Sequence, residues 1–430
     1  MDMRVYPSRL SGSVQAVASK SEAHRLLICA AFADGVTDID CNTTSQDIDA
    51  TADCLRALGA RVTRTKKGFR VVPVAPGAAA QGTVLDCGES GSTLRFLLPV
   101  AAALGCGASL TGRGRLPERP LSPLYEELVA HGAELGAQGS MPLAVGGELS
   151  SGRFTIAGNV SSQYVTGLLL AAPLMQGACE VFVTEPIESL PYIDITVAAL
   201  AEFGVDVARE RHAQDGKKGL LFRVPVSSRL HSPGQVSIGG DWSNAAFWLA
   251  AGALSEGGVT VEGVDLRSTQ GDRAILAALA MLGARVERGA SSVTVRPDVL
   301  RGCKLDVRAC PDLVPPLAAV AACAEGTTEI VGAERLRIKE SDRLQTVSDA
   351  VTALGGTVRQ TNDGLVIEGA RELAGGVVDA ANDHRIAMMS AILAARAQGP
   401  SVIRGAQCVA KSYPAFFNDL AALGGTCDPT

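Results

Sequence analysis

Residues 326–356 have the sequence GTTEIVGAERLRIKESDRLQTVSDAVTALGG, and this stretch shows the pattern from which the whole chain is built. A β-type run follows Gly326, and a polar loop then leads into an amphipathic helix that closes on Gly355. Glycine directly after a helix is typical of a C-terminal cap. The stretch therefore predicts a strand, a charged loop and a helix in immediate succession.

The same pattern occurs six times, with a period of roughly 70 residues. Each copy has an Ala/Leu-rich helical run, a glycine, a short strand, a polar loop and a second helix that closes on another glycine. Two helices and several strands per period predict an α/β repeat. The strands follow Gly35, Gly107, Gly177, Gly258, Gly326 and Gly399, and the second helices close on Gly59, Gly132, Gly204, Gly283, Gly355 and Gly424.

The spacing of the copies widens between the third and the fourth, around residues 209–218 and 224–240. Three copies therefore lie on each side of this break. A chain of 430 residues is also long enough for two or three domains of roughly 150 residues each. We expect an α/β protein with two lobes of three repeats.

The composition is that of a globular protein, with 47% hydrophobic and 20% charged residues. A formal net charge of −6 argues against a general nucleic-acid surface, although cations gathered locally could still bind anions. The apolar stretches are too short for a membrane helix, and the first residues resemble neither a secretion signal nor a transit peptide. Eleven cysteines without CxxC pairs indicate core residues in a reducing cytoplasm and no zinc site.

Polar residues gather at the start of the first helix of each repeat. Serine, aspartate and asparagine there are ordinary N-caps, and we expect Asp241 and Ser243 to act mainly in this way. Cations oppose the helix macrodipole at that end, so Lys20, Arg25 and Arg385 need another explanation. An anion held by the backbone N–H groups and these cations supplies one.

Two loops after strands are rich in arginine and lysine. The first carries Arg113, Arg115 and Arg119, and its prolines, Pro117 and Pro120, rule out a helix there. The second contains Arg335, Arg337, Lys339, Glu340 and Arg343, and Lys411 holds the corresponding place in the last repeat. Arginine forks suit phosphate and carboxylate groups, whereas lysine offers a compact charge. The sequence has neither GxxxxGK[ST] nor a convincing GxGxxG, so no nucleotide loop is predicted.

Nine segments in one order together resemble the enolpyruvyl transferases, and among these the 5-enolpyruvylshikimate-3-phosphate synthase family. They span residues 20–417 and read SKSEAHR, GESGSTLR, RPLSPL, SSQY, PYIDIT, PDLVPPLA, IKESDRL, NDHRIAM and AKSYPAFF. The resemblance implies two lobes of three βαβαββ repeats in an inside-out α/β barrel, with the active site in the cleft between them. It implies a phosphoenolpyruvate-side lobe formed by 1–18 and 238–430, a shikimate-phosphate-side lobe formed by 19–237, and closure on the substrates.

The resemblance implies transfer of the enolpyruvyl group of phosphoenolpyruvate to shikimate 3-phosphate, with no metal or other cofactor. A cytoplasmic monomer with no nucleic-acid or membrane partner is expected. Lys20, Ser21 and Arg25 are implied to meet both substrates, with Arg25 on the shikimate carboxylate. Ser161, Ser162 and Ser189 are implied to hold the 3-phosphate, with Gln163 between the substrates and Tyr192 nearby. The residues implied to bind the phosphate and carboxylate of phosphoenolpyruvate are Gly91, Arg119, Arg343, Arg385 and Lys411.

The same resemblance assigns acid–base roles. Asp312 is implied to bond the attacking 5-hydroxyl, with Lys339 beside it, and Glu340 to donate the proton, although Lys20 is a rival donor. Many family members have asparagine at the positions of Glu89 and Arg335, so we assign these two residues no role. Two alternatives are a UDP-N-acetylglucosamine enolpyruvyl transferase and a non-catalytic module that binds anions. The first normally has a cysteine in the arginine loop, and this chain has none between Gly107 and Ala178.

Overall fold

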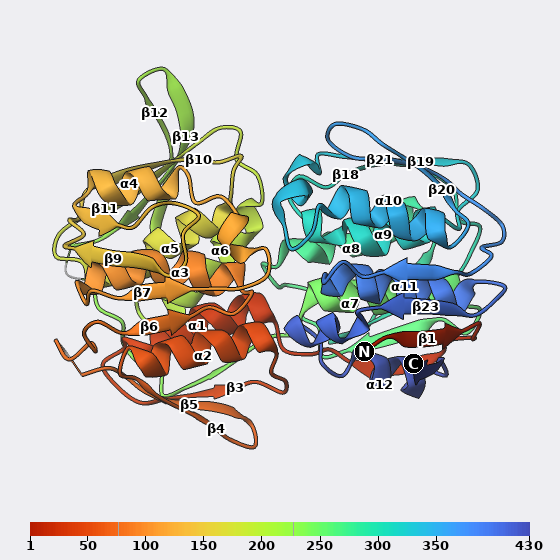
Figure 1. Ribbon diagram of the computed structural model, residues 1–430, viewed down its shortest axis with the longest axis horizontal. Helices are drawn as coiled ribbons and strands as arrows, with labels where there is room; N and C mark the ends of the chain where they lie inside the picture. Colours follow the sequence, from red (N-terminus) through yellow and green to blue (C-terminus); the bar gives the residue numbers. More distant parts are fainter. Residues whose placement is uncertain (76, 227) are drawn as a thin grey trace. The chain divides into compact units, whose positions relative to one another are not determined.

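The computed structural model describes residues 1–75, 77–226 and 228–430. The chain divides into two compact units, each with its own hydrophobic core. The inserted unit is Ala18–Ile238, and the terminal unit combines Met1–Val17 with Gly239–Thr430. Figure 1 shows both ends of the chain within the terminal unit, where β1 and β24 pair.

Each unit contains three repeats with the order β-α-β-α-β-β, as the sequence predicted. The inserted unit has β14 (Gln235–Ser237), α1 (Lys20–Ala31), β3 (Thr37–Asp40), α2 (Gln46–Ala57), β4 (Arg61–Arg64), β5 (Gly68–Val72); β6 (Val84–Asp86), α3 (Gly91–Leu104), β7 (Ser109–Thr111), α4 (Leu124–Ala130), β8 (Ala133–Leu135), β9 (Leu143–Gly147); and β10 (Arg153–Ala157), α5 (Ser162–Ala171), β11 (Cys179–Thr184), α6 (Leu190–Glu202), β12 (Ala208–Gln214), β13 (Lys217–Val224).

The terminal unit follows the same plan. It has β2 (Gly12–Gln15), α7 (Trp242–Leu254), β15 (Val259–Glu262), α8 (Ile275–Met281), β16 (Arg285–Arg288), β17 (Ser292–Arg296); β18 (Lys304–Asp306), α9 (Val314–Ala321), β19 (Thr327–Val331), α10 (Arg343–Ala353), β20 (Thr357–Gln360), β21 (Leu365–Glu368); and β22 (Val377–Asp379), α11 (His384–Arg396), β23 (Ser401–Arg404), α12 (Phe416–Ala422), β24 (Thr426–Pro429), β1 (Met3–Tyr6).

In the described residues each repeat forms a four-stranded sheet, and the six sheets share one topology. In the order β6-β7-β9-β8, for example, the first pair is parallel and the other two pairs are antiparallel. Three sheets are completed by strands from far along the chain, and in one of them β1 pairs with both β23 and β24. β14 pairs with β3, and β2 pairs with β15. Each of β2 and β14 is the last strand of its unit before the chain passes into the other unit.

The first helix of each repeat lies inside its unit. Helix α5 contacts both α1 and α3, while α7, α9 and α11 contact one another, and nearly all the side chains of these six helices are buried. A helix that is hydrophobic on every side belongs in a core, which the Ala/Leu-rich sequences of these segments allow. The second helices bury only one face against the sheets. The polar starts of the inner helices therefore belong to otherwise apolar segments.

The six glycines predicted to close the second helices all have positive φ, between 76° and 108°. A residue without Cβ adopts this left-handed conformation at little cost, so these helix stops are confirmed. The prediction for the first arginine loop needs a correction, because Leu116–Glu118 form a single 3-10 turn. Proline at an early helical position lacks only an N–H that has no partner in such a turn, so Pro117 is compatible with it.

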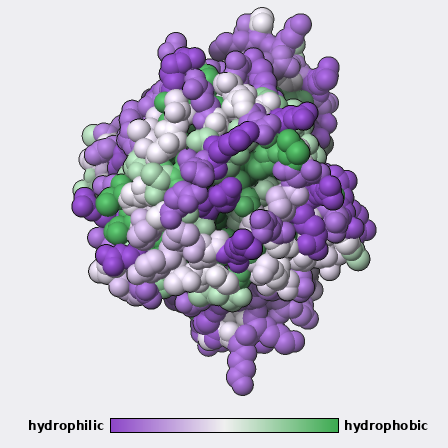
Figure 2. All heavy atoms as spheres, turned by 90° about the vertical axis from the view of Figure 1, so that its right-hand side faces the viewer, coloured by the Kyte–Doolittle hydropathy of each residue, from purple (hydrophilic) through white to green (hydrophobic). Residues whose placement is uncertain are grey.

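One face of the molecule, shown in Figure 2, is mostly hydrophilic, and its hydrophobic residues are scattered in small groups. No helix in the described parts of the chain combines the length and the apolar character needed to cross a bilayer.

Candidate active site

Side-chain caps fix the starts of the inner helices. The side chains of Ser19, Ser90, Ser161, Asp241 and Asp383 accept backbone N–H groups of the helices that follow them. Capping is therefore confirmed for Asp241, which accepts from the backbone N–H of Asn244 at 2.8 Å. It was wrong for Ser243, which is the second residue of α7 and donates its hydroxyl to Asp241 Oδ1 at 2.8 Å. These caps hold the first-turn residues of α1, α3, α5, α7 and α11 in fixed directions.

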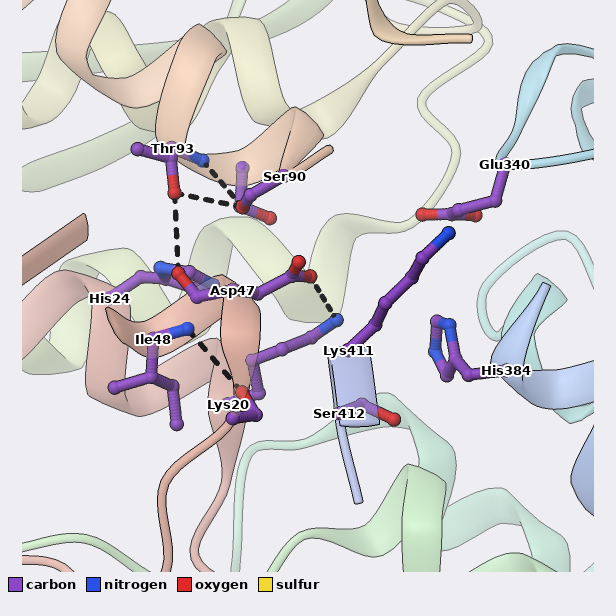
Figure 3. Close-up of polar contacts among 12 residues, drawn as sticks. Lys20, His24, Asp47, Ile48, Ser90, Thr93, Glu340, His384, Lys411 and Ser412 are labelled. Carbon is purple, nitrogen blue, oxygen red and sulfur yellow. Dashed lines mark hydrogen bonds and ion pairs between the residues drawn. The ribbon is translucent and has the colours of Figure 1, made fainter. Parts of the chain in front are cut away.

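Lys20 opens α1 and forms an ion pair with Asp47 of α2. The Nζ atom lies 2.8 Å from Asp47 Oδ2, and both side chains are largely buried, at 15% and 12% exposure. Figure 3 shows the two side chains pointing toward each other. No local sequence pattern points to Asp47 as a site residue, because its partner lies 27 positions away in another helix.

Arg25 lies one turn further along α1 and is held by neutral acceptors. Its guanidinium donates to Thr196 Oγ1 at 2.8 Å, to the Ser21 carbonyl at 2.5 Å, and to Thr166 Oγ1 and the Tyr192 carbonyl at 3.2 and 3.0 Å. A guanidinium has five N–H groups, so one N–H on Nη1 is left over from these bonds to the described residues. Burial lowers the pKa of Arg25 to about 10.

Gly91 begins α3 and lies against two arginines. A Cβ atom at this position would come within 2.5 Å of Arg119 Nη1 and 2.9 Å of Arg95 Nη1. Arg95 also donates to Gln163 Oε1 at 2.9 Å and to the Pro120 carbonyl at 3.0 Å. The sequence analysis missed Arg95 as a site residue. An arginine inside the apolar run after Gly91 was the available signal, and the structure shows that it joins three of the predicted segments.

The start of α5 and the start of α6 carry the remaining candidates of the inserted unit. Ser161 caps α5, and Gln163 Nε2 donates to Ser92 Oγ at 3.0 Å, which ties α5 to α3. Ser189 precedes α6 in the left-handed region, with φ of 54°, and is 3% exposed. Tyr192 contributes its carbonyl to Arg25. The structure thus joins these residues to Arg25 and Gly91 through α1, α3, α5 and α6. Ser162 is the first residue of α5.

In the terminal unit, Arg343 binds three carboxylates. Its Nε donates to Asp383 Oδ2 at 2.8 Å, its Nη1 to Asp312 Oδ1 at 2.9 Å, and its Nη2 to Glu340 Oε2 at 2.5 Å. The Arg343 side chain is 1% exposed, whereas those of Asp312 and Glu340 are 18% and 19% exposed. A buried guanidinium thus holds two partly accessible carboxylates, which are the two predicted acid–base residues.

Arg385 adds a second cation to the same cluster. Its Nη2 donates to Asp312 Oδ2 and to Ser243 Oγ, both at 3.1 Å. Burial by itself would raise the pKa of Asp312, but the charges of Arg385, Lys339 and Arg343 outweigh it and hold the pKa well below the usual range. Asp312 is therefore a firmly ionised carboxylate here, with Lys339 near enough to act on it as predicted.

Lys411 lies in the 3-10 helix η6 (Ala406–Lys411) and is 4% exposed. Its Nζ donates to the Asn382 carbonyl at 2.5 Å, just before α11. Asn382 and Ala381 both have positive φ, which turns that carbonyl toward Lys411 in place of continuing the strand. The predicted cations Arg385 and Lys411 thus approach the start of the same helix.

The two positions that depart from the family pattern have structural surroundings of their own. Glu89 packs against Gly114, where a Cβ would lie 2.6 Å from its Oε2. Arg335 is partly buried and donates to the Arg308 carbonyl at 3.2 Å. Both contacts hold a loop of the candidate site to a neighbouring loop.

Two units of three βαβαββ repeats, with buried cations at the starts of their inner helices, have the architecture of the enolpyruvyl transferases. The enolpyruvyl transferase NikO from Streptomyces tendae has this fold, with a TM-score of 0.77, 19% identity and coverage of 100% of this chain and 98% of its own. EPSP synthase from Acinetobacter baumannii matches with a TM-score of 0.79, 28% identity and coverage of 99% of both chains.

The chain belongs to the EPSP synthase (3-phosphoshikimate 1-carboxyvinyltransferase) family, whose model matches residues 5–420. A curated 3-phosphoshikimate 1-carboxyvinyltransferase from Clostridium kluyveri is 41% identical over 99% of this chain and 97% of its own length. Another from Clostridium novyi is 36% identical over 99% of this chain and 98% of its own. The sequence-based family assignment and fold class are therefore confirmed, and the UDP-N-acetylglucosamine alternative is not favoured.

Proposed function

We propose that the chain transfers the enolpyruvyl group of phosphoenolpyruvate to the 5-hydroxyl of shikimate 3-phosphate and releases phosphate. The observation that carries this proposal is the cluster around Arg343, which gathers two accessible carboxylates and a second arginine. Family membership supports the same reaction. We also propose that the protein is a monomer and lies in the cytoplasm.

The reaction needs an acid, a base and fixed positive charge. The methylene carbon of phosphoenolpyruvate gains a proton while the 5-hydroxyl attacks C2 and loses its own. The resulting tetrahedral ketal phosphate then expels phosphate and loses a proton from the methyl group, which restores the enol ether. Positioned side chains can move these protons, and preorganised cations can stabilise the anionic groups throughout.

The inserted unit supplies the proposed site for shikimate 3-phosphate. Arg25 binds the shikimate carboxylate through its remaining N–H, and its neutral partners leave the positive charge for that ligand. Ser161, Ser162 and Ser189 bind the 3-phosphate at the starts of α5 and α6, where the helix dipole favours an anion. Gln163 and Tyr192 lie beside these groups.

The terminal unit supplies the proposed acid–base pair and part of the phosphoenolpyruvate site. Arg343, Arg385 and Lys411 bind the phosphate and carboxylate of this substrate, together with Gly91 and Arg119 of the inserted unit. Asp312 bonds the 5-hydroxyl and accepts its proton, with Lys339 beside it. Its ion pairs make Asp312 a weak base before substrate binds, and substrate anions that compete for Arg385 and Arg343 strengthen it.

Glu340 is the proposed proton donor to the methylene carbon. Its ion pair with Arg343 requires the carboxylate form, so Glu340 must gain a proton as the substrate anions engage that arginine. Lys20 is the second candidate, and its ion pair with Asp47 holds the ammonium group in place. Exchange of solvent deuterium into the methylene group of phosphoenolpyruvate distinguishes them. Glu340→Gln abolishes the exchange if Glu340 is the donor, and Lys20→Met does so if Lys20 is.

Phosphate release tests the proposed function directly. We expect release only when shikimate 3-phosphate and phosphoenolpyruvate are both present, with no decrease in the presence of EDTA. UDP-N-acetylglucosamine in place of shikimate 3-phosphate serves as the control for the related transferase activity. Substrate binding without phosphate release would identify a non-catalytic anion-binding module and contradict the proposal.

A further inference from the structure

A chain of hydrogen bonds runs through the buried interior of the inserted unit. His24 Nδ1 of α1 lies 2.7 Å from Thr51 Oγ1 of α2, and Thr51 Oγ1 lies 2.7 Å from Thr93 Oγ1 of α3. Thr93 Oγ1 then donates to Ser90 Oγ at 2.8 Å. These four residues are at most 1% exposed. Figure 3 shows His24, Thr93 and Ser90 at successive places along this chain.

The donors and acceptors of the chain have one consistent order. The Thr93 hydroxyl has a single hydrogen and gives it to Ser90, so Thr93 accepts from Thr51. Thr51 in turn has used its hydrogen and accepts from His24 Nδ1. In this order His24 is the Nδ1–H tautomer, and the Thr93 hydroxyl also has the Asp47 carbonyl as a second, more distant acceptor at 3.5 Å.

The surroundings of the ring favour the same tautomer. His24 Nε2 is buried without a hydrogen-bond partner among residues 1–75, 77–226 and 228–430, so a hydrogen there would be a donor without an acceptor. Burial, and then the charges of Lys20 and Arg25, lower the pKa of His24 well below its ordinary value. The ring is neutral, touches no exposed surface and is unsuited to exchange protons with a substrate.

The chain of hydrogen bonds from His24 to Ser90 ends next to residues of the candidate site. Lys20 lies one turn before His24 on α1, and its partner Asp47 lies one turn before Thr51 on α2. Ser90 also caps α3 by accepting the Thr93 backbone N–H at 3.2 Å, and the next residue is Gly91. Hydrogen bonds with a fixed order define how helices are placed along one another better than apolar contacts do. The chain thus fixes the start of α3 relative to Lys20.

We propose that His24, Thr51 and Thr93 are positioning residues that hold the Ser90–Gly91 turn in register with Lys20 and thereby set the affinity for phosphoenolpyruvate. The inference rests on the proposed function, because Gly91 and Lys20 act there on this substrate. Small misplacements of a binding group are costly, since about 1 Å can change a rate by roughly a hundredfold. The Arg25 side of the site is held by other bonds, to Thr166, Thr196 and Tyr192.

Thr51→Val tests the inference, because valine keeps the shape and removes the hydroxyl that links His24 to Thr93. We expect the KM for phosphoenolpyruvate to rise roughly tenfold and the KM for shikimate 3-phosphate to change less than twofold, which is the split that a positioning role predicts. Thr51→Ser, which keeps the hydroxyl, should have the native KM for phosphoenolpyruvate. Thr260→Val is the matched control, since it removes a 2.7 Å Thr260–Thr294 bond in the terminal unit and should leave both constants unchanged.

Thr93→Val, which retains the His24–Thr51 bond, repeats the test if Thr51→Val does not fold. Equal rises in both KM values, or values indistinguishable from those of Thr260→Val, would overturn the inference while the native chain still releases phosphate. A native chain that releases no phosphate with both substrates would instead overturn the proposed function, so the two failures are distinguishable.

Discussion

Arg25 of the inserted unit and Arg343 of the terminal unit are both buried, at 2% and 1% exposure, but they have opposite surroundings. Within the described residues, Arg25 donates hydrogen bonds to hydroxyl and carbonyl oxygens, whereas Arg343 binds three carboxylates. Burial lowers the pKa of Arg25 to about 10. Burial also acts to lower the pKa of Arg343, but Asp383, Glu340 and Asp312 outweigh it and raise the pKa above its ordinary value.

The difference separates two ways to bind an anion. Arg25 is hydrogen-bonded to neutral oxygens, so a ligand carboxylate can pair with it without displacing a carboxylate of the protein. Arg343 is already balanced, and an anion that reaches it must compete with Asp312 or Glu340. We infer that the shikimate 3-phosphate residues are prepared before binding, while the acid–base cluster changes partners when phosphoenolpyruvate arrives.

The largest expected effect comes from removing each arginine in turn. Arg343→Met leaves three carboxylates close together without their shared cation, and breaking a buried ion pair in this way costs about 3–5 kcal/mol. Arg25→Met removes hydrogen bonds to neutral oxygens and leaves no carboxylate of a three-carboxylate cluster without its cation, so it should lower the unfolding free energy by less than Arg343→Met does. Urea unfolding should show a much lower midpoint for Arg343→Met. Equal urea midpoints would show that the charges of Arg25 and Arg343 are offset by the protein to the same extent.

Next in size is the effect of neutralising the acid–base pair. Asp312→Asn and Glu340→Gln should each lower kcat by roughly a hundredfold or more, the usual contribution of a positioned acid or base. Substrate binding should largely survive, because both changes leave every arginine in place. Glu329→Gln, an exposed carboxylate paired with Lys304 in the same unit, is the matched control. Near-normal turnover in both variants would remove Asp312 and Glu340 from the mechanism.

A smaller effect is expected at Gly91. The added Cβ of Gly91→Ala would press on Arg119 Nη1 and Arg95 Nη1, and these flexible ends must shift by a few tenths of an ångström or more. The site should then exclude the bulkier inhibitor glyphosate more than phosphoenolpyruvate. The ratio of the glyphosate inhibition constant to the KM for phosphoenolpyruvate should rise severalfold, about 1 kcal/mol for a fivefold change. An unchanged ratio would show that the methyl group does not reach the part of the pocket that distinguishes them.

Local patterns predicted much of the fold. The six strands after glycine and the six glycine helix stops follow from spacing and backbone conformation, which neighbouring residues determine. The pairing of β14 with β3 and of β1 with β23 could not be predicted in the same way. These pairs join residues about 200 or 400 positions apart, and short strands carry little information about such distant partners.

The residues of the candidate site also divide into those with a local sequence signal and those without one. Arg385 was selected because a cation near a helix start needs an explanation, and Arg343 and Lys411 were selected because they lie in basic loops after strands. The structure places all three in the terminal unit. Asp47 was missed because it carries no local signal, and Asp383, which lies in the quoted segment NDHRIAM, was given no role. It both caps α11 and binds Arg343, and only the fold brings α10 to α11.

Calorimetric titration of each substrate, alone and with the other present, tests the central claim most directly. The claim is that the residues around Arg25 can bind their ligand without rearrangement, whereas Arg343 must exchange a carboxylate of the protein for a substrate anion. We predict that shikimate 3-phosphate binds the free chain and that phosphoenolpyruvate binds weakly alone and at least tenfold more tightly once shikimate 3-phosphate is bound. Arg25→Met should abolish the first binding event. Equal affinity for phosphoenolpyruvate with and without shikimate 3-phosphate would contradict the account.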